Sequence, residues 1–170
     1  MPVGCGRPCL GTEARLAATS RARHAEVVAA ESADPVRLIP YGAATLRVLA
    51  ETQGLAIAEL DVPAGFLSPP PAIHNGFDEA IYVVTGQLTV VRGHDHARTV
   101  SAGGLFAIPR GTRHAFANET DQPALVLGMW SPGSALRFIS DIGAALPASG
   151  YPDLAVLGDV YRRHHSELAV

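Results

Sequence analysis

Three ionisable side chains, His74, Glu79 and His114, occupy sequence settings that would turn them towards the interior of a folded domain. His74 lies in a stretch rich in Pro and Gly, where a stiff backbone can aim its ring inward. Glu79 opens an apolar run and shares a face with Ile81, because side chains on a strand alternate with a period of two. A carboxylate on such a core-facing row costs several kcal/mol unless it is paired or bound to a cation.

His114 follows the turn Pro-Arg-Gly and shares its strand face with Phe116. Ionisable groups on the core faces of separate turns and strands indicate one shared polar site. Two neutral imidazoles and one carboxylate are donors that suit Fe, Mn, Ni, Cu or Zn. The residues therefore predict a polar site inside the domain, with a donor set suited to a divalent metal ion.

The elements that would position these residues are short. From Pro35 onward, runs such as GLAIAELDV, EAIYVVTG, GLFAIP and ALVLGMW follow one another, each bounded by Gly, Pro, Asn or Asp. Strands of this length and spacing, without helical periods between them, are typical of an all-β sandwich or barrel. The connections TGQ and RGHDHA resemble hairpin turns between strands that pair in sequence.

The pattern changes after Trp130. Apolar residues recur at a helical spacing in SPGSALRFISDIGAAL, at Leu136, Ile139, Ile142 and Leu146. A second helix is expected in PDLAVLGDVYRRHHSELAV, beginning after Pro152 with Asp153 near its N-terminus. The predicted organisation is an N-terminal arm over 1–33, a β-barrel over 34–131 and a C-terminal helical segment over 132–170.

The N-terminal arm is expected to be either helical, over 12–30, or disordered. Both cysteines, Cys5 and Cys9, fall in it, and no second Cys/His pair of matching spacing follows, so they are interpreted as exposed thiols. The arm has no continuous apolar core of a signal peptide, so a cytoplasmic location is expected.

Composition excludes several classes of function. A net charge of −3 without a basic stripe gives no reason to expect a nucleic-acid partner. No apolar run approaches the roughly 18 residues that a membrane span requires, so no membrane partner is expected. All 13 basic residues are Arg, which excludes mechanisms that need a Lys nucleophile or base.

The two segments around the histidines resemble the paired motifs of the cupin superfamily, small proteins built on a double-stranded β-helix. The second motif is matched at each of its positions: Gly103, Pro109, Gly111, His114 and Asn118. The first is matched at His74, Glu79 and Gly86, whereas Ala72 stands where its first His belongs. The resemblance covers roughly residues 36–131, and the SPGSALRFISDIG tail is similar to that of small quercetin-dioxygenase-like cupins.

The resemblance implies that His74, Glu79 and His114 hold a divalent metal ion, with Fe(II) favoured and Mn, Ni, Cu or Zn as alternatives. Ala72 allows two interpretations. Losing one ligand of four could weaken metal binding by about two or more orders of magnitude. Alternatively, two His and one carboxylate are the ligands of non-haem Fe(II) oxygenases, which keep positions open for substrate and oxygen.

The leading functional hypothesis is a dioxygenase acting on a small aromatic or enolisable substrate, with Glu79 as the catalytic base. Ile81, Phe116 and Trp130 are the candidate walls of the substrate pocket, because aromatic and apolar walls suit small ligands. One alternative is an isomerase, cyclase or dehydratase in which His74, His114 and Glu79 exchange protons, with or without metal. Another is a non-catalytic barrel that binds a small molecule. A homodimer is implied by the resemblance, and exposed sheet edges favour it.

Four other histidines are interpreted as surface residues. His94 and His96 lie in a turn marked by Gly and Asp, and His164 and His165 follow two Arg near the end of the second helix. Tyr82 lies on the strand face opposite to Glu79, so it is expected outside the barrel or in a subunit interface.

Overall fold

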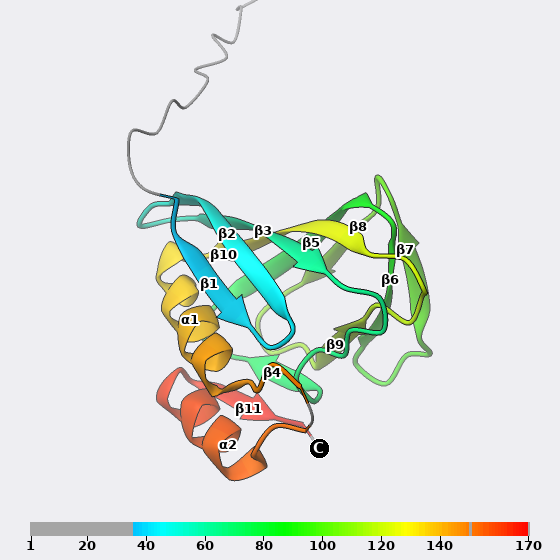
Figure 1. Cartoon of the computed structure of the whole chain (residues 1–170). Helices are drawn as coiled ribbons and strands as arrows, with labels where there is room; N and C mark the ends of the chain where they lie inside the picture. The colour runs from blue at the N-terminus through cyan, green and yellow to red at the C-terminus, as the bar shows by residue number, and fades with distance from the viewer. Residues whose placement is uncertain (1–35, 150, 170) are drawn as a thin grey trace, which may run out of the picture. The chain divides into compact units, whose positions relative to one another are not determined.

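Short strands form two antiparallel sheets in the computed structural model, which describes residues 36–149 and 151–169. These residues belong to one unit, Asp34–Val170. The predicted arm over 1–33, with its helix, Cys5 and Cys9, lies outside the described residues. The predicted all-β fold with C-terminal helices is confirmed (Figure 1).

The larger sheet has six strands in the order β1-β2-β3-β10-β5-β8. Their bounds are Leu38–Tyr41 (β1), Ala44–Glu51 (β2), Ala56–Val62 (β3), Ala124–Ser131 (β10), Asp78–Thr85 (β5) and Leu105–Ile108 (β8). The smaller sheet has the order β11-β4-β9-β6-β7. Its strands are Ser166–Leu168 (β11), Ala72–His74 (β4), His114–Ala117 (β9), Gln87–Arg92 (β6) and Arg98–Ser101 (β7).

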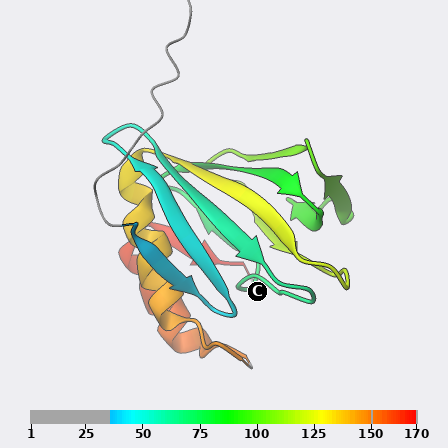
Figure 2. The same ribbon diagram turned by 45° about the horizontal axis from the view of Figure 1, so that its top comes forward.

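The two-residue alternation predicted for β5 decides which of its side chains enter the core. Ile81 and Val83 are buried, whereas Tyr82 is 36% exposed on the opposite face, as expected. Inward-facing side chains of both sheets form a common apolar core, because each sheet buries one face against the other. Figures 1 and 2 show the two sheets curved around this shared interior.

Gly86 connects the two sheets, and the prediction of a hairpin at TGQ was wrong. β5 pairs with β8 and β10, whereas β6 pairs with β7 and β9. The chain changes sheets at Gly86, where φ is +75° and an added Cβ would come within 2.9 Å of Ala124. Only glycine suits such a corner. The predicted hairpin at RGHDHA is confirmed, since β6 and β7 pair directly.

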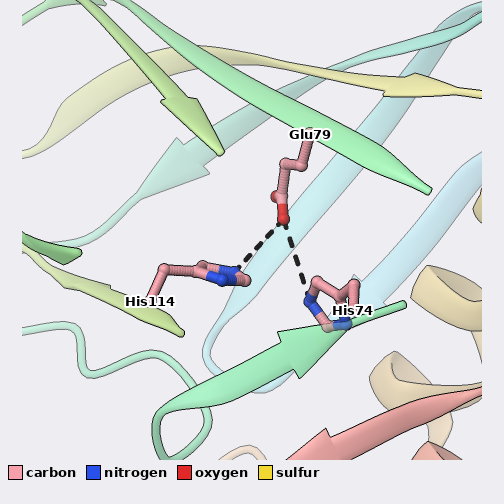
Figure 3. A group of neighbouring side chains, drawn as sticks. All are labelled: His74, Glu79 and His114. Atoms are coloured by element: carbon pink, nitrogen blue, oxygen red, sulfur yellow. Dashed lines mark ion pairs between the residues drawn. The ribbon is translucent and has the colours of Figure 1, made fainter. Parts of the chain in front are cut away.

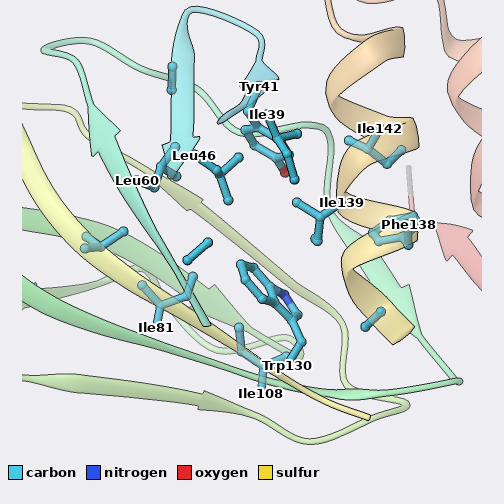
Figure 4. Close-up of a cluster of buried hydrophobic side chains, with 14 of the residues drawn as sticks. Ile39, Tyr41, Leu46, Leu60, Ile81, Ile108, Trp130, Phe138, Ile139 and Ile142 are labelled. Atoms are coloured by element: carbon cyan, nitrogen blue, oxygen red, sulfur yellow. The ribbon is translucent and has the colours of Figure 1, made fainter. Parts of the chain in front are cut away.

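Two helices follow the barrel, after a 3₁₀ turn at Gly133–Ala135. α1, Leu136–Ala145, buries Leu136, Phe138, Ile139 and Ile142, in agreement with the predicted helical spacing. Figure 4 shows Ile139 and Phe138 extending from α1 beside the barrel side chains. α2, Leu154–Arg163, begins where predicted, because the Asp153 side chain accepts hydrogen bonds from the N–H groups of Ala155 and Val156. Neither described helix has the length and apolarity needed to cross a membrane.

The end of the described chain is a strand, so the prediction of a helix continuing to the end was wrong. α2 ends at Arg163, and His165 adopts a φ of +54°, which reverses the chain direction. β11 then pairs with β4, with Ser166 opposite His74. A three-residue strand is too short to show a period of its own, and the preceding helical pattern hid it.

Packing of α1 on β1 generates a first prediction. An added Cβ at Gly143 would overlap the carbonyl oxygen of Pro40, whereas one at Gly158 in α2 would meet only Leu168 Cδ1, at 4.0 Å. We expect Gly143→Ala to lower the free energy of unfolding by about 1–3 kcal/mol through overpacking. Gly158→Ala should raise it by up to about 1 kcal/mol through helix propensity. Urea unfolding of both variants checks this pair, and an unaffected Gly143→Ala variant would contradict the packing described.

Candidate metal centre

The structure brings His74, Glu79 and His114 together between the two sheets (Figure 3). One ligand atom from each residue lies within 4.8 Å of the other two. Glu79 Oε2 is 3.3 Å from His114 Nε2 and 3.9 Å from His74 Nε2. All three side chains are less than 10% exposed, at 6% for His74, 7% for His114 and 9% for Glu79.

Strand register explains why the three residues meet. Glu79 lies on β5 in the larger sheet, flanked by Trp130 on β10 and Ile108 on β8. The two histidines lie on neighbouring strands of the facing sheet, β4 and β9. Ala72 is the residue paired with His114, so the position of the absent first histidine is buried beside the cluster.

The Pro-Arg-Gly turn fixes His114 relative to the other two residues. Gly111 has a φ of +76°, and its N–H donates a 2.7 Å hydrogen bond to the carbonyl of His74. The backbone N–H and the guanidinium of Arg110 both bond to Asp78, the neighbour of Glu79. The hydrogen bonds from Arg110 hold the pKa of Asp78 down at about 2. One turn is thereby tied to both strands that carry the other two candidate ligands.

The ring orientations leave the Nε2 atoms of both histidines facing Glu79. On the far side of the site, His114 Nδ1 lies 3.1 Å from the carbonyl of Thr112, and His74 Nδ1 lies 3.0 Å from Ser166 Oγ. Histidines that ligate metals usually donate their second ring N–H to such outer partners. The hydrogen bonding therefore matches that of a metal centre.

The donor set fits a divalent metal ion. Two imidazole lone pairs and a carboxylate that face one another are mutually unfavourable without a proton or cation between them. The indole N–H of Trp130 is buried on the strand beside Glu79, where it favours the ionised carboxylate.

The protonation of the two histidines differs. Burial lowers the pKa of His74 to about 4, against a raising effect from Glu79 and a further lowering by His114. Burial also disfavours the charged form of His114, but the hydrogen bond and charge of Glu79 outweigh it, and the net pKa is raised. Glu79 therefore favours the protonated form of His114, in which the added proton lies between this ring and the carboxylate.

Glu79 stays ionised in this setting. Burial raises its pKa, but the hydrogen bond and charge of His114, the charge of His74 and the nearby Trp130 indole outweigh burial, so the net pKa is lowered. The carboxylate is thus available as a ligand or as a base.

Two small cavities flank Glu79, each of about 30 Å³. Such a volume admits a water molecule, whereas pockets for drug-sized ligands measure hundreds of Å³. A larger pocket, of about 420 Å³, lies outside the site and shares Ser68, Pro69 and Pro70 with the cavity that the histidines line. The Ser68–Pro70 segment therefore separates the three candidate ligands from the larger pocket.

The candidate substrate-binding residues line the apolar cavity. Ile81, Phe116 and Trp130 all border the space on one side of Glu79, and Phe116 also borders the cavity with the histidines. Ile81 and Trp130 are at the same time core residues, 3% and 4% exposed. Their role towards a substrate stays a prediction.

Sequence reasoning missed three residues at the site. Tyr41 from β1 and Tyr161 from α2 line the cavity with the histidines, and Ser166 contacts His74. Burial raises the pKa of both phenols, and neighbouring Glu79 adds to this shift, so both stay protonated. Tyr161 follows the buried Leu157 by four residues, a helical spacing that indicates a buried face. No comparable pattern marks Tyr41 or Ser166.

Of the four histidines expected at the surface, three are exposed: His94, His96 and His165. His164 is not, because its side chain is only 23% exposed and its Nε2 lies 2.8 Å from Asp141 Oδ2. This pair joins α2 to α1, which the sequence pattern of each helix alone does not reveal.

Comparisons with known proteins agree with this architecture. Residues 58–130 match the family model described as "Cupin domain". Germin-like protein 5-1 of Oryza sativa subsp. japonica is 32% identical over 84 residues, covering 47% of this chain and 38% of that protein. Germin-like protein subfamily 2 member 2 of Arabidopsis thaliana is 32% identical over 104 residues, covering 57% of this chain and 47% of that protein. The chain thus spans less than half the length of these relatives.

A solved structure supports the fold. The crystal structure of a sugar phosphate isomerase from a cupin superfamily, from Silicibacter pomeroyi, superimposes with a TM-score of 0.51 at 21% identity. The alignment covers 58% of this chain and 72% of that chain. At this identity the likeness concerns the fold alone.

The lowered pKa of His74 generates a second prediction. The unfolded state, with a His pKa near 6.5, binds more protons than the folded state between pH 6.5 and 4. Stability is therefore lost as pH falls through this range. We compare the parent and His74→Gln in the presence of a chelator. Between pH 7 and 4.5, the free energy of unfolding of the parent should fall by about 2–3 kcal/mol more than that of the variant. Urea unfolding at a series of pH values checks this, and equal slopes would contradict a buried, neutral His74.

Proposed function

The barrel of this chain belongs to the cupin superfamily, and we propose that it is a metal-dependent enzyme in which His74, Glu79 and His114 hold a divalent ion. The observation that carries this proposal is the convergence of two Nε2 atoms and one carboxylate oxygen within 4.8 Å, with both Nδ1 atoms engaged on the far side. Two imidazoles and a carboxylate favour Fe(II) among the candidate metals.

The finer proposal is a dioxygenase. When bound, the ion would supply Lewis-acid chemistry at an oxygen atom of the substrate. Glu79, ionised and 9% exposed, is placed to accept a proton from the substrate. The protonated phenols of Tyr41 and Tyr161 line the same cavity and can donate hydrogen bonds to a substrate oxygen. Apolar side chains around Glu79 exclude water, which strengthens these interactions.

Cavity size does not separate an enolisable substrate from an aromatic one, because about 30 Å³ beside the histidines holds only a water-sized occupant. We propose that the substrate approaches from the larger pocket, and that the segment formed by Ser68, Pro69 and Pro70 moves to admit it. Small hydroxyketones and diketones need the smallest movement.

A second candidate function is acid–base catalysis without oxygen, as in an isomerase, cyclase or dehydratase. The observation that favours it is the opposite shift of two neighbouring histidines, one neutral and one with a raised pKa. A pair of groups whose pKa values are pushed apart can supply one base and one acid.

Metal content tests the proposed site. Protein purified without a polyhistidine tag should contain close to one equivalent of a transition metal by mass spectrometry. His114→Ala should lose it, because only two ligands remain, whereas His94→Ala, in an exposed turn, should keep it. Ala72→His should bind metal about 100-fold more tightly, since this position lies opposite His114 and a ligand contributes a few kcal/mol. Metal in Ala72→His alone would contradict the three-ligand site.

Oxygen uptake tests the reaction class. With a panel of small hydroxyketones and diketones, the metal-loaded parent should consume about one O₂ per substrate, because both oxygen atoms enter the product and no external reductant is needed. His114→Ala should show only the uncatalysed rate. Substrate proton exchange in D₂O under nitrogen, with a chelator present, would instead support the acid–base alternative. Tight binding of one of these compounds without formation of any product would contradict both proposed enzymatic activities. It would support a non-catalytic barrel that binds a small molecule.

A further inference from the structure

The short strand β11 places one polar side chain against the outer side of a candidate ligand, His74. Ser166 pairs with His74 across the β4–β11 ladder and is only 2% exposed. The turn before β11 is fixed to the neighbouring strand end, since Asn75 N–H donates to the carbonyl of His165 at 3.1 Å. The location of Ser166 beside His74 is therefore set by backbone pairing on both sides of the contact.

The hydrogen bonds of Ser166 favour one tautomer of His74. Ser166 Oγ lies 3.3 Å from the carbonyl of His164, which can only accept, so the hydroxyl can donate there. When its single proton is used in this way, the 3.0 Å contact with His74 Nδ1 is donated by Nδ1–H. A neutral imidazole with its proton on Nδ1 has its lone pair on Nε2, the atom that faces Glu79.

The rest of the C-terminal segment holds the same ring. The centroid of Phe138 from α1 lies 4.8 Å from that of His74 in an edge-on contact, and Tyr161 from α2 stacks at 5.9 Å. Phe77 stacks on the ring at 4.5 Å. His114 differs, because its Nδ1 is held by Thr112 in its own turn. Of the two rings, only His74 depends on residues that follow the barrel.

We propose that Ser166 is a positioning residue of the metal centre, which keeps His74 in the Nδ1–H tautomer and so makes Nε2 available as a ligand. This inference rests on the proposed function, since it assigns a residue to the same site. It also gives a reason why three ligands can suffice although Ala72 stands in place of the fourth: both histidine rings are oriented before the ion binds. At 2% exposure, Ser166 has no access for a substrate and is not a nucleophile.

The tautomer is measured directly. In metal-free protein labelled with ¹⁵N-histidine, two-bond ¹H–¹⁵N correlations at pH 7.5 distinguish Nδ1–H from Nε2–H, and His74 is neutral there. We expect His74 in the parent to be the Nδ1–H form. Ser166→Ala removes the acceptor, so the proton should move towards Nε2, where Glu79 can accept it. Metal affinity should fall about 10- to 100-fold, the usual effect of losing such an outer contact.

Two variants give matched controls. Ser166→Thr keeps a hydroxyl on the strand and should restore both the tautomer and the affinity. Glu167→Ala removes the adjacent side chain of β11, whose Oε1 accepts from Asn75 Nδ2, and should leave both readouts unchanged. Thermal unfolding of each variant separates the loss of the contact from the loss of the fold.

The outcomes also separate this inference from the proposed function. A parent in which His74 carries its proton on Nε2 overturns the assignment, as does a Ser166→Ala variant with reduced stability but unchanged tautomer and affinity. If the parent binds no metal while Ser166→Ala still shifts the tautomer, the proposed function fails and the positioning role of Ser166 stands.

Discussion

A buried carboxylate between two imidazole lone pairs is the constraint on which the rest of the site depends. Glu79 Oε2 lies 3.3 and 3.9 Å from the Nε2 atoms of the histidines, in a space that excludes all but a water-sized occupant. Such a group of acceptors is stable only with a positive charge among them, as a proton on His114 or as a metal ion. The outer hydrogen-bond partners, Ser166 and Thr112, contact the Nδ1 atoms of the two histidines. Both Nε2 atoms therefore face the position of that positive charge.

The fold meets this constraint by drawing the ligands from both sheets. Glu79 comes from β5, next to the edge strand β8 of the larger sheet, where Ile108 and Trp130 flank it, and the histidines come from adjoining strands of the smaller one. The Pro-Arg-Gly turn then links the sheets locally, through Gly111 to His74 and through Arg110 to Asp78. The positions of the ligands are thus properties of the barrel, whereas the orientation of one ring is a property of the C-terminal segment.

Local patterns in the sequence predict most of the barrel and the three clustered residues. The inward face of Glu79 follows from the alternation of β5, and the start of α2 from the capping residue Asp153. The rest depends on contacts that no local pattern contains. The local sequence around Gly86 favours a hairpin turn. Only the pairing of β5 and β6 with different strands shows that the chain crosses between sheets there. Ser166 follows a helix and lies on a strand that is too short to show an alternating pattern. Its contact is with His74, which is far away in the sequence, so no local pattern indicates it.

That separation in sequence gives the two histidines different behaviour during folding. His114 and its partner Thr112 are two residues apart, so their contact closes whenever the turn forms, whereas His74 and Ser166 are separated by 92 residues. Closing so long a loop carries a larger entropic cost, and a segment that depends on such contacts can open without unfolding of the whole domain. Opening of α2 and β11 would release one ring while the barrel stays folded. Dissociation of a bound ion would then follow the opening rate of this C-terminal segment and not the rate of global unfolding.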